Sequence, residues 1–250
     1  LYFQANFNEG ARHAADLITA SQRSGILLHR AWGLSDQAAN SMRLGLIDEA
    51  VRWLDEALAL YATNTDLISE AATWGLLAQT LLRQGNRARA REAAEKARRL
   101  LGKSSPTSHY LLEAYAGVAE TYLALWEAGL RGETTGEERR TLAQAGRQAA
   151  KGLRAYASVL PMGEPRAALH EGVYQWLAGR HAAAHRTWQK GLAAAESLNM
   201  PYDQGLLLLE VGRHLRPQNP ARTARARRAH DLFARLGAAY DLEQTDRLLK

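Results

Sequence analysis

The 250-residue sequence contains no cysteine and no apolar run of membrane-spanning length. Without cysteine, a disulfide framework, a thiolate metal site and a cysteine nucleophile are excluded, which fits a reducing compartment. A membrane-spanning helix needs roughly 20 apolar residues in a row, and no stretch approaches that length. Hydrophobic residues at 46% and charged residues at 23% are ordinary for a folded soluble protein. We therefore expect a cytoplasmic protein with no membrane segment.

The sequence also lacks the motifs of common enzymes and cofactor sites. It has no Gly-x-Ser-x-Gly elbow. The stretch "GKSSPTS", residues 102–108, lacks the upstream glycine of a phosphate-binding loop, because Ala97 stands there. His181 and His185 have metal-ligand spacing, but no glutamate follows His181 and no third ligand is evident, so both histidines are expected to pack or be exposed. We expect a non-enzymatic chain with no catalytic residue, no cofactor and no metal.

No methionine stands near the start of the sequence. The opening residues "LYFQA" resemble the end of a viral-protease recognition site of the kind that an expression tag leaves behind. We therefore expect residues 1–5 to be a tag remnant and residues 6–250 to form a single helical repeat domain. We also expect this domain to be a fragment of a longer protein, whose catalytic domain would lie outside it.

Alanine, in contrast, recurs at helical spacing where a core normally has leucine. Between Trp74 and Ala97 an apolar stripe stops at Gly85 and then resumes with small residues. The anchors of this stretch are Trp74, Leu77, Ala78, Leu81, Gly85, Ala90, Ala94 and Ala97. Inward-facing alanine lets a neighbouring helix come close, so the stretch predicts two helices packed back to back. The order of anchors resembles a tetratricopeptide (TPR) repeat.

The same order of anchors recurs along the chain. Ala50 stands 40 residues before Ala90, and Ala184 stands 35 residues after Ala149, close to the TPR period of about 34. Ala149 stands 59 residues after Ala90, so this unit contains an insertion, which we place at residues 127–140. That segment is rich in Gly, Thr and Glu, and Thr134 or Thr135 is expected to cap the helix after it.

Two further helices are expected at the ends of the array. Residues 11–20 form an orphan helix before the first unit, and residues 241–249 form a short amphipathic helix that covers the last layer. No segment alternates with period two over a useful length, so essentially no strand is expected. The predicted fold is all-α: a right-handed α-solenoid of about five degenerate TPR-like helical hairpins with a C-terminal capping helix.

A narrower resemblance lies near the C-terminus. The phrases "LNMPY" at 198–202, "EVGRHL" at 210–215 and "FARLGA" at 233–238 are similar to the TPR-like end of large bacterial signalling proteins. In that family a class III adenylate or guanylate cyclase, or a Ser/Thr kinase, is followed by an AAA-like or STAND-type ATPase and then by such repeats. The resemblance implies a sensor or docking arm that regulates an attached output domain of a bacterial protein.

Certain positions of the first helix of each TPR unit face the concave groove, and they give the candidate partner-binding residues. These residues are Trp32, Gln79, Glu113, Glu120, Arg166, Trp176, Arg213 and Arg216. The predicted groove is acidic in its middle and basic towards the C-terminus, with Trp32 and Trp176 as aromatic anchors. An error of one position would rotate a residue by roughly 100° and off the groove.

The function that follows is non-catalytic protein interaction or regulation. The expected partner is a peptide, a protein or the upstream domain of the same polypeptide, and a homodimer stays open. One alternative is nucleic-acid binding: the net charge is +6, and residues 212–235 carry seven arginines against Asp231. The arginines Arg222, Arg225, Arg227 and Arg228 lack interleaved aromatic residues, which makes nucleic acid the less favoured partner. A second alternative function is that of a small-molecule sensor, which would require a closed apolar pocket. Whether the insertion occupies the groove is also open.

Overall fold

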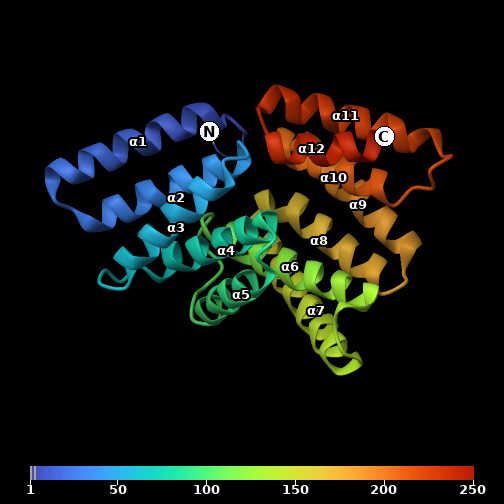
Figure 1. The fold of residues 1–250 in the computed structure, drawn as a ribbon, viewed down its shortest axis with the longest axis horizontal. Helices are drawn as coiled ribbons and strands as arrows, with labels where there is room; N and C mark the ends of the chain where they lie inside the picture. The colour runs from blue at the N-terminus through green and yellow to red at the C-terminus, as the bar shows by residue number, and fades with distance from the viewer. Residues whose placement is uncertain (1, 3) are drawn as a thin grey trace.

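The computed structural model describes Tyr2 and residues 4–250. This part of the chain folds into α-helices joined by short turns and contains no strand (Figure 1). The helices are α1 (Phe7–Ser24), α2 (Leu27–Arg43), α3 (Ile47–Tyr61), α4 (Leu67–Gln84), α5 (Arg87–Leu101), α6 (Leu111–Ala128), α7 (Gly136–Val159), α8 (Glu164–Leu177), α9 (His181–Ser197), α10 (Pro201–Arg213), α11 (Pro220–Leu236) and α12 (Ala239–Leu249), with a π-helical turn η1 (Gly129–Glu133) and a 3-10 turn η2 (Pro161–Gly163). None of the described helices is both long enough and apolar enough to cross a membrane.

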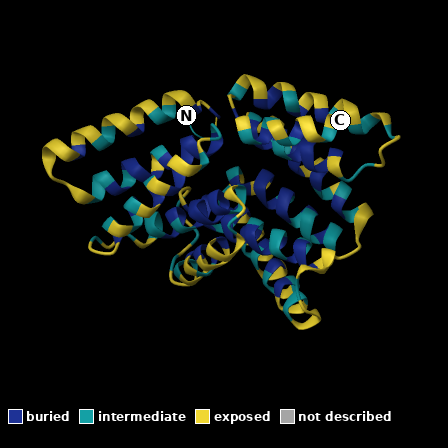
Figure 2. Cartoon of the chain, viewed as in Figure 1, coloured by how far each residue is buried: buried dark blue, intermediate teal, exposed yellow. Residues whose placement is uncertain are grey.

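The helices pair as the sequence predicts, and the α-solenoid is confirmed. The five hairpins are α2/α3, α4/α5, α6/α7, α8/α9 and α10/α11, with α1 as the orphan helix and α12 as the cap. The first helices of successive hairpins also contact one another, from α2 through α4, α6, α8 and α10 to α12. They form an inner layer, and burial is concentrated on them, whereas α1, α5 and α11 carry much of the exposed surface (Figure 2).

Small residues allow the inner helices to pack closely. Ala78 and Ala90 are fully buried, as the repeat pattern requires. At the crossing of α4 and α6, a Cβ atom added to Gly117 would lie 2.2 Å from the carbonyl oxygen of Gly75. These two helices therefore touch backbone to backbone. Gly85 ends α4 with φ +85°, a left-handed conformation that glycine adopts without steric cost.

The insertion lies against the outer layer. It consists of η1 and the turn that leads into α7, where the Thr135 hydroxyl accepts a hydrogen bond from the Glu138 amide at 3.2 Å. Arg87 pairs with Glu133, and Arg91 pairs with Glu138 at 2.9 Å, so α5 holds the insertion from outside. Of the predicted insertion 127–140, η1 and the start of α7 are thus held on the outer side, whereas Glu127 belongs to the last turn of α6 and faces Arg213. The α6/α7 hairpin projects from the array (Figure 1).

The two ends of the array meet across the concave face. Leu44, in the turn after α2, packs into the same apolar cluster as Ala238 at the start of α12. A Cβ atom on Gly45 would lie 2.9 Å from the Cβ atom of Ala239. Figure 1 shows the N-terminal and C-terminal helices converging at this point. The solenoid therefore curls far enough that its inner layer encloses side chains from both ends.

Candidate binding site on the concave face

Most of the predicted groove residues lie together on the inner layer. Gln79 is on α4, Glu113 and Glu120 are on α6, Arg166 is on α8 and Arg213 is the last residue of α10. They converge because every first helix presents its concave side to the same enclosed centre. Gln79, Glu113 and Arg166 are buried there, whereas Arg213 is exposed at the edge.

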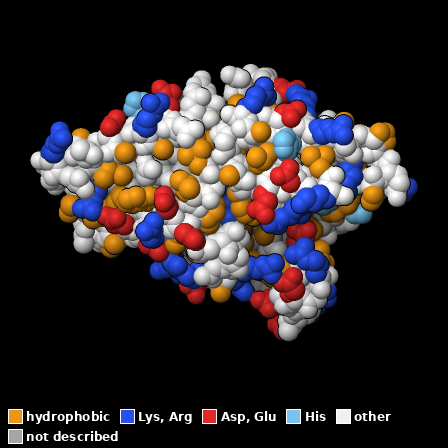
Figure 3. Space-filling view, turned by 45° about the horizontal axis from the view of Figure 1, so that its top comes forward, with side chains coloured by type: hydrophobic (Ala, Val, Ile, Leu, Met, Phe, Trp, Pro, Cys, Tyr) orange, Lys and Arg blue, Asp and Glu red, His pale blue; other side chains and the backbone are white. Residues whose placement is uncertain are grey.

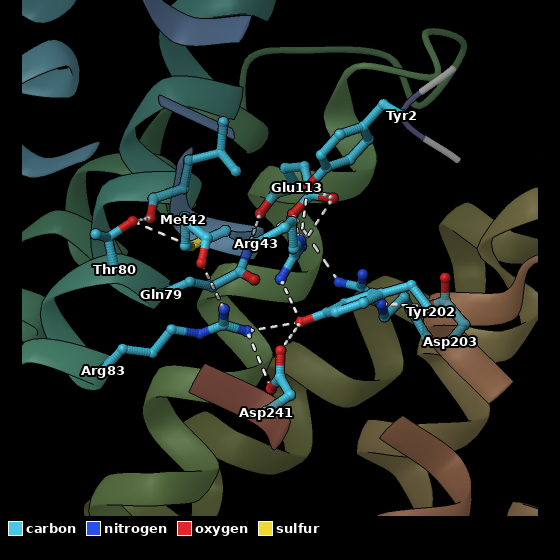
Figure 4. A network of polar contacts seen from close by, with 12 residues as sticks. Tyr2, Met42, Arg43, Gln79, Thr80, Arg83, Glu113, Tyr202, Asp203 and Asp241 are labelled. Atoms are coloured by element: carbon cyan, nitrogen blue, oxygen red, sulfur yellow. Dashed lines mark hydrogen bonds and ion pairs between the residues drawn. The ribbon is translucent and has the colours of Figure 1, made fainter. Parts of the chain in front are cut away.

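A buried charged cluster occupies that centre (Figure 4). Arg43 and Glu113 form its core, with Arg43 Nη2 3.2 Å from Glu113 Oε2, although their side chains are only 1% and 8% exposed. Gln79 Nε2 donates to Glu113 Oε2 at 2.9 Å. Arg166 Nη1 lies 3.9 Å from the same oxygen, and its Nε pairs with Asp203. Each charge is thereby matched by an opposite charge, as burial in a low-dielectric interior requires.

Tyr202 connects this core to the C-terminal end of the array. Its hydroxyl accepts hydrogen bonds from Arg43 Nη1 at 3.2 Å and Arg83 Nη2 at 3.0 Å. The same hydroxyl donates to Asp241 Oδ2 at 2.7 Å. Arg83 Nη2 also lies 3.8 Å from Asp241 Oδ1. Polar contacts therefore link α2, α4, α10 and α12, and they reinforce the apolar contact that closes the array.

The two glutamates of α6 have different environments. Burial alone would raise the pKa of Glu113, but Arg43, Arg166 and the hydrogen bonds it accepts hold that pKa below its usual value. Burial raises the pKa of Glu120, because the more distant arginines compensate only in part. No hydrogen bond or ion pair reaches the Glu120 carboxylate from the described residues. Glu113 is therefore a fixed anion, whereas Glu120 has unused bonding capacity.

A cavity of about 230 Å³ lies beside the cluster, between α6, α8, α10 and α12. Its lining includes Glu120, His170, Glu127 and Arg213. The last two form an ion pair, with Arg213 Nη2 3.6 Å from Glu127 Oε1. His170 is 5% exposed, and no hydrogen bond from the described residues reaches its Nε2 atom. The cavity thus presents polar groups whose bonding is incomplete, among apolar side chains such as Val173.

Burial and neighbouring charges keep His170 and Glu210 in defined protonation states. Burial, with help from Arg166, lowers the pKa of His170 to about 3, so the imidazole is neutral at pH 7. Burial works against ionisation of Glu210, but Arg213 and His214 lower its pKa to about 2. The wall of the cavity therefore combines a neutral imidazole with a carboxylate.

Trp32, Trp176 and Arg216 do not join the cluster or line the cavity. Trp32 Nε1 donates to Asp66 Oδ2, 2.8 Å away, and Asp66 is the N-cap residue of α4. Trp176 stacks on His181, with ring centroids 4.0 Å apart. Arg216 lies in the turn beyond α10, because that helix ends at Arg213. The predicted aromatic anchors are therefore engaged in contacts within the repeats.

The histidine pair packs against tryptophan. His181 stacks on Trp176, and His185 meets the rings of Trp176 and Trp188 edge-on at 5.7 Å and 5.4 Å. His214 stacks parallel to Trp188, with ring centroids 5.1 Å apart. Among the described residues no three His, Asp or Glu side chains are arranged to hold a metal ion.

Sequence reasoning missed Arg43, Arg83, Tyr202 and Asp241. Arg43 and Arg83 do share a sequence pattern that could have identified them. Each stands two residues before the glycine that ends the first helix of its hairpin, in "MRLG" and "LRQG". Tyr202 and Asp241 carry no such local signal. They reach the cluster because the curvature of the array brings α10 and α12 next to α2.

The comparisons with known proteins agree with this architecture. The tetratricopeptide repeat family model matches residues 29–103, which span the first two hairpins. No curated protein matches the chain. The solved structure of BtubC (BKLC) from P. vanneervenii is similar, with a TM-score of 0.57, 16% identity, and coverage of 97% of this chain and 90% of that chain.

A second similar structure is TTC0263, a thermophilic TPR protein from Thermus thermophilus. Its TM-score is 0.46 and its identity 22%, over 84% of this chain and 96% of that chain. At such identities the likeness to BtubC shows the fold alone. Residues 29–103 therefore match the tetratricopeptide repeat model, and the described chain has an α-solenoid fold like that of BtubC.

Proposed function

We propose that this chain is a non-catalytic domain that binds a segment of a peptide or protein on its concave face. Tetratricopeptide repeats generally mediate interactions between proteins. The observation that carries the proposal for this chain is the cavity between Glu120, His170 and Arg213, where buried or partly buried polar groups have incomplete bonding. Such groups gain hydrogen bonds when a partner side chain enters.

The size of the cavity favours a side chain over a free small molecule. Its volume of about 230 Å³ is smaller than the 300–1,000 Å³ or so of typical small-molecule pockets. Its wall also carries several charged groups, whereas a sensor pocket is expected to be mainly apolar. A single side chain of a longer partner fits both features, with the rest of the partner lying along the inner helices.

The charges at the cavity wall would select among partners. Arg213 pairs with Glu127 and with Glu210, so positive and negative charges lie next to each other on the cavity wall. A partner with an acidic and a basic residue near its anchor would match this arrangement. Complementary charges of this kind raise the association rate and exclude partners of the wrong pattern.

The arginines of α11 offer less support for nucleic-acid binding. Arg228 pairs with Glu196 at 2.7 Å, and Arg222 donates to the carbonyl oxygen of Leu215 at 3.1 Å. Figure 3 shows acidic and basic side chains interspersed among apolar ones on the face turned towards the viewer. A nucleic-acid surface concentrates positive charge instead. Both features favour a protein partner.

The resemblance of the C-terminal phrases suggests the setting of this activity. In a bacterial signalling protein, the domain would act in the cytoplasm as a regulatory arm of an attached cyclase, kinase or ATPase. Binding at the concave face would shift the output domain between restrained and active arrangements. It would do so only to the extent that the partner binds those two arrangements with different affinity.

A peptide-display selection against the full chain tests the proposal. The selected peptides are then measured by titration calorimetry on the native chain, on Arg213→Glu at the cavity wall and on Arg52→Glu as a matched control. Arg52 is an exposed arginine of α3 in the outer layer, with a side chain 75% exposed. We expect Arg213→Glu to weaken binding roughly tenfold or more and Arg52→Glu to leave it unchanged. Equal binding to all three proteins would refute concave-face recognition.

A further inference from the structure

We propose that Arg43 and Glu113 form a receptor for the unphosphorylated tyrosine side chain of a bound peptide. The inference rests on the proposed function, because it names the side chain that the concave face recognises. In the structure Tyr2 occupies this receptor (Figure 4). Its hydroxyl donates to Glu113 Oε1 at 3.1 Å and accepts from Arg43 Nε at 3.0 Å.

Tyr2 reaches the receptor from outside the repeats. It precedes α1, and a hydrogen bond of 2.9 Å from the Ala5 amide to the Tyr2 carbonyl forms a turn before that helix. Its ring packs edge-on against Phe7 at 5.9 Å, and Phe7 packs edge-on against Tyr202 at 5.5 Å. Tyr2 and Phe7 thus both lie against the charged cluster of the concave face.

The chemistry of the receptor selects a phenol. A hydroxyl group satisfies both Glu113, which accepts, and Arg43, which donates, whereas phenylalanine satisfies neither. The Arg43 guanidinium also lies 5.7 Å from the Tyr2 ring centroid, which favours an aromatic ring over the short hydroxyl side chains of serine and threonine. Burial raises the pKa of Tyr2, so the phenol keeps its proton and donates it to the carboxylate.

The same geometry excludes two related ligands. A phosphotyrosine would bring its dianion against the buried carboxylate of Glu113, which is 6% exposed. An acidic side chain would likewise pair with Arg43 but meet Glu113 as a like charge. Recognition therefore depends on the phenol in its neutral state, and phosphorylation of the ligand tyrosine would prevent binding.

Tyr2 competes with any peptide in trans. A short tether holds its side chain at an effective concentration in the millimolar range. The test therefore uses the full chain with Tyr2→Ala, which vacates the receptor, together with the native chain. Tyr110→Ala is the matched control, because Tyr110 is 49% exposed and does not contact the cluster.

The probe is a peptide with the sequence of residues 1–5, acetylated and amidated, whose binding is followed by saturation-transfer NMR. We expect it to bind Tyr2→Ala roughly tenfold or more tightly than the native chain or Tyr110→Ala. Replacing its tyrosine with phenylalanine should weaken binding roughly tenfold, and replacing it with phosphotyrosine should abolish binding. The inference fails if the phenylalanine peptide binds as tightly, or if no probe binds Tyr2→Ala at about 5 mM, a concentration comparable with the tethered one.

Peptides from the display selection separate this inference from the proposed function. Selected peptides without tyrosine that bind equally to the native chain and to Tyr2→Ala, yet lose affinity on Arg213→Glu, would overturn the tyrosine receptor and leave concave-face binding intact. Peptides that are insensitive to Arg213→Glu would overturn the proposed function. Tyrosine-containing peptides that bind Tyr2→Ala more tightly than the native chain, and that also lose affinity on Arg213→Glu, would support both.

Discussion

A single methyl group added at Gly117 should separate α4 and α6, two neighbouring helices of the inner layer. In Gly117→Ala the new Cβ atom would lie 2.2 Å from the Gly75 carbonyl oxygen, and neither helix can relieve the overlap by turning a side chain. The backbones would have to part by about 1 Å to reach an ordinary contact distance. Overpacking of this kind costs up to about 3 kcal/mol, and alanine regains about 1 kcal/mol through helix propensity. We therefore expect the free energy of unfolding to fall by about 2 kcal/mol.

Gly152→Ala provides the control for this prediction. Gly152 is also within a helix, α7, but a Cβ atom there would lie 3.7 Å from the Tyr115 ring, an ordinary contact. This variant should gain up to about 1 kcal/mol from propensity alone. Urea denaturation followed by circular dichroism measures both variants against the native chain. Equal stability of Gly117→Ala and Gly152→Ala would refute the backbone-to-backbone packing of α4 and α6.

Three further predictions concern the charged cluster and the helix caps. Arg43→Met leaves Glu113 buried without its main cation and should cost about 3–5 kcal/mol in urea denaturation, and Glu113→Gln in the same chain should recover much of that loss. In the folded chain the pKa of His170 is lowered from 6.5 to about 3, so between these pH values the unfolded chain binds a proton that the folded chain does not. The free energy of unfolding should therefore be unaffected by His170 above pH 6.5. It should decrease as the pH falls below 6.5, by about 3 kcal/mol at pH 4. His170→Gln should flatten the pH dependence of the urea midpoint between those values. In thermal denaturation, Asp66→Ala should lower the free energy of unfolding by about 2 kcal/mol, because Asp66 both caps α4 and accepts the N–H of Trp32. Thr135→Ala should lower it by about 1 kcal/mol, because Thr135 only caps α7.

Residues that repeat locally made much of the fold predictable. The small residues around Ala78 and Ala90 mark the buried faces of a hairpin, and Gly85 ends its first helix in a left-handed conformation. Thr135 caps α7 with Glu138 behind it, which the sequence also indicates. Each of these signals depends on neighbours within a few turns, so one sequence is enough to detect it.

The candidate site depended on curvature, which no local pattern encodes. Gln79, Glu113 and Arg166 were predicted to face the groove because they lie on first helices, but their mutual contacts arise only when the array curls. Tyr202 and Asp241 enter the cluster from the far end of the chain, which local periodicity does not reveal. Trp32 and Trp176 have the predicted helical positions, yet they pack sideways onto neighbouring polar and aromatic residues. Whether any of these residues binds a partner stays a prediction.

The charged cluster explains how an array of similar small-residue contacts keeps one curvature. Stripes of alanine and leucine can slide or rotate against each other at little cost, because apolar contacts are not directional. Arg43, Glu113 and Asp241 lie on three different inner helices, and displacing any of these helices would leave a buried charge without its partner. The cluster thus fixes the register of the inner layer, and that register sets the width of the cavity beside it. A ligand that bonds to Arg43 or Glu113 acts on the same contacts that hold the curvature. The proposed binding at the concave face would therefore be coupled to the shape of the solenoid through one set of ion pairs.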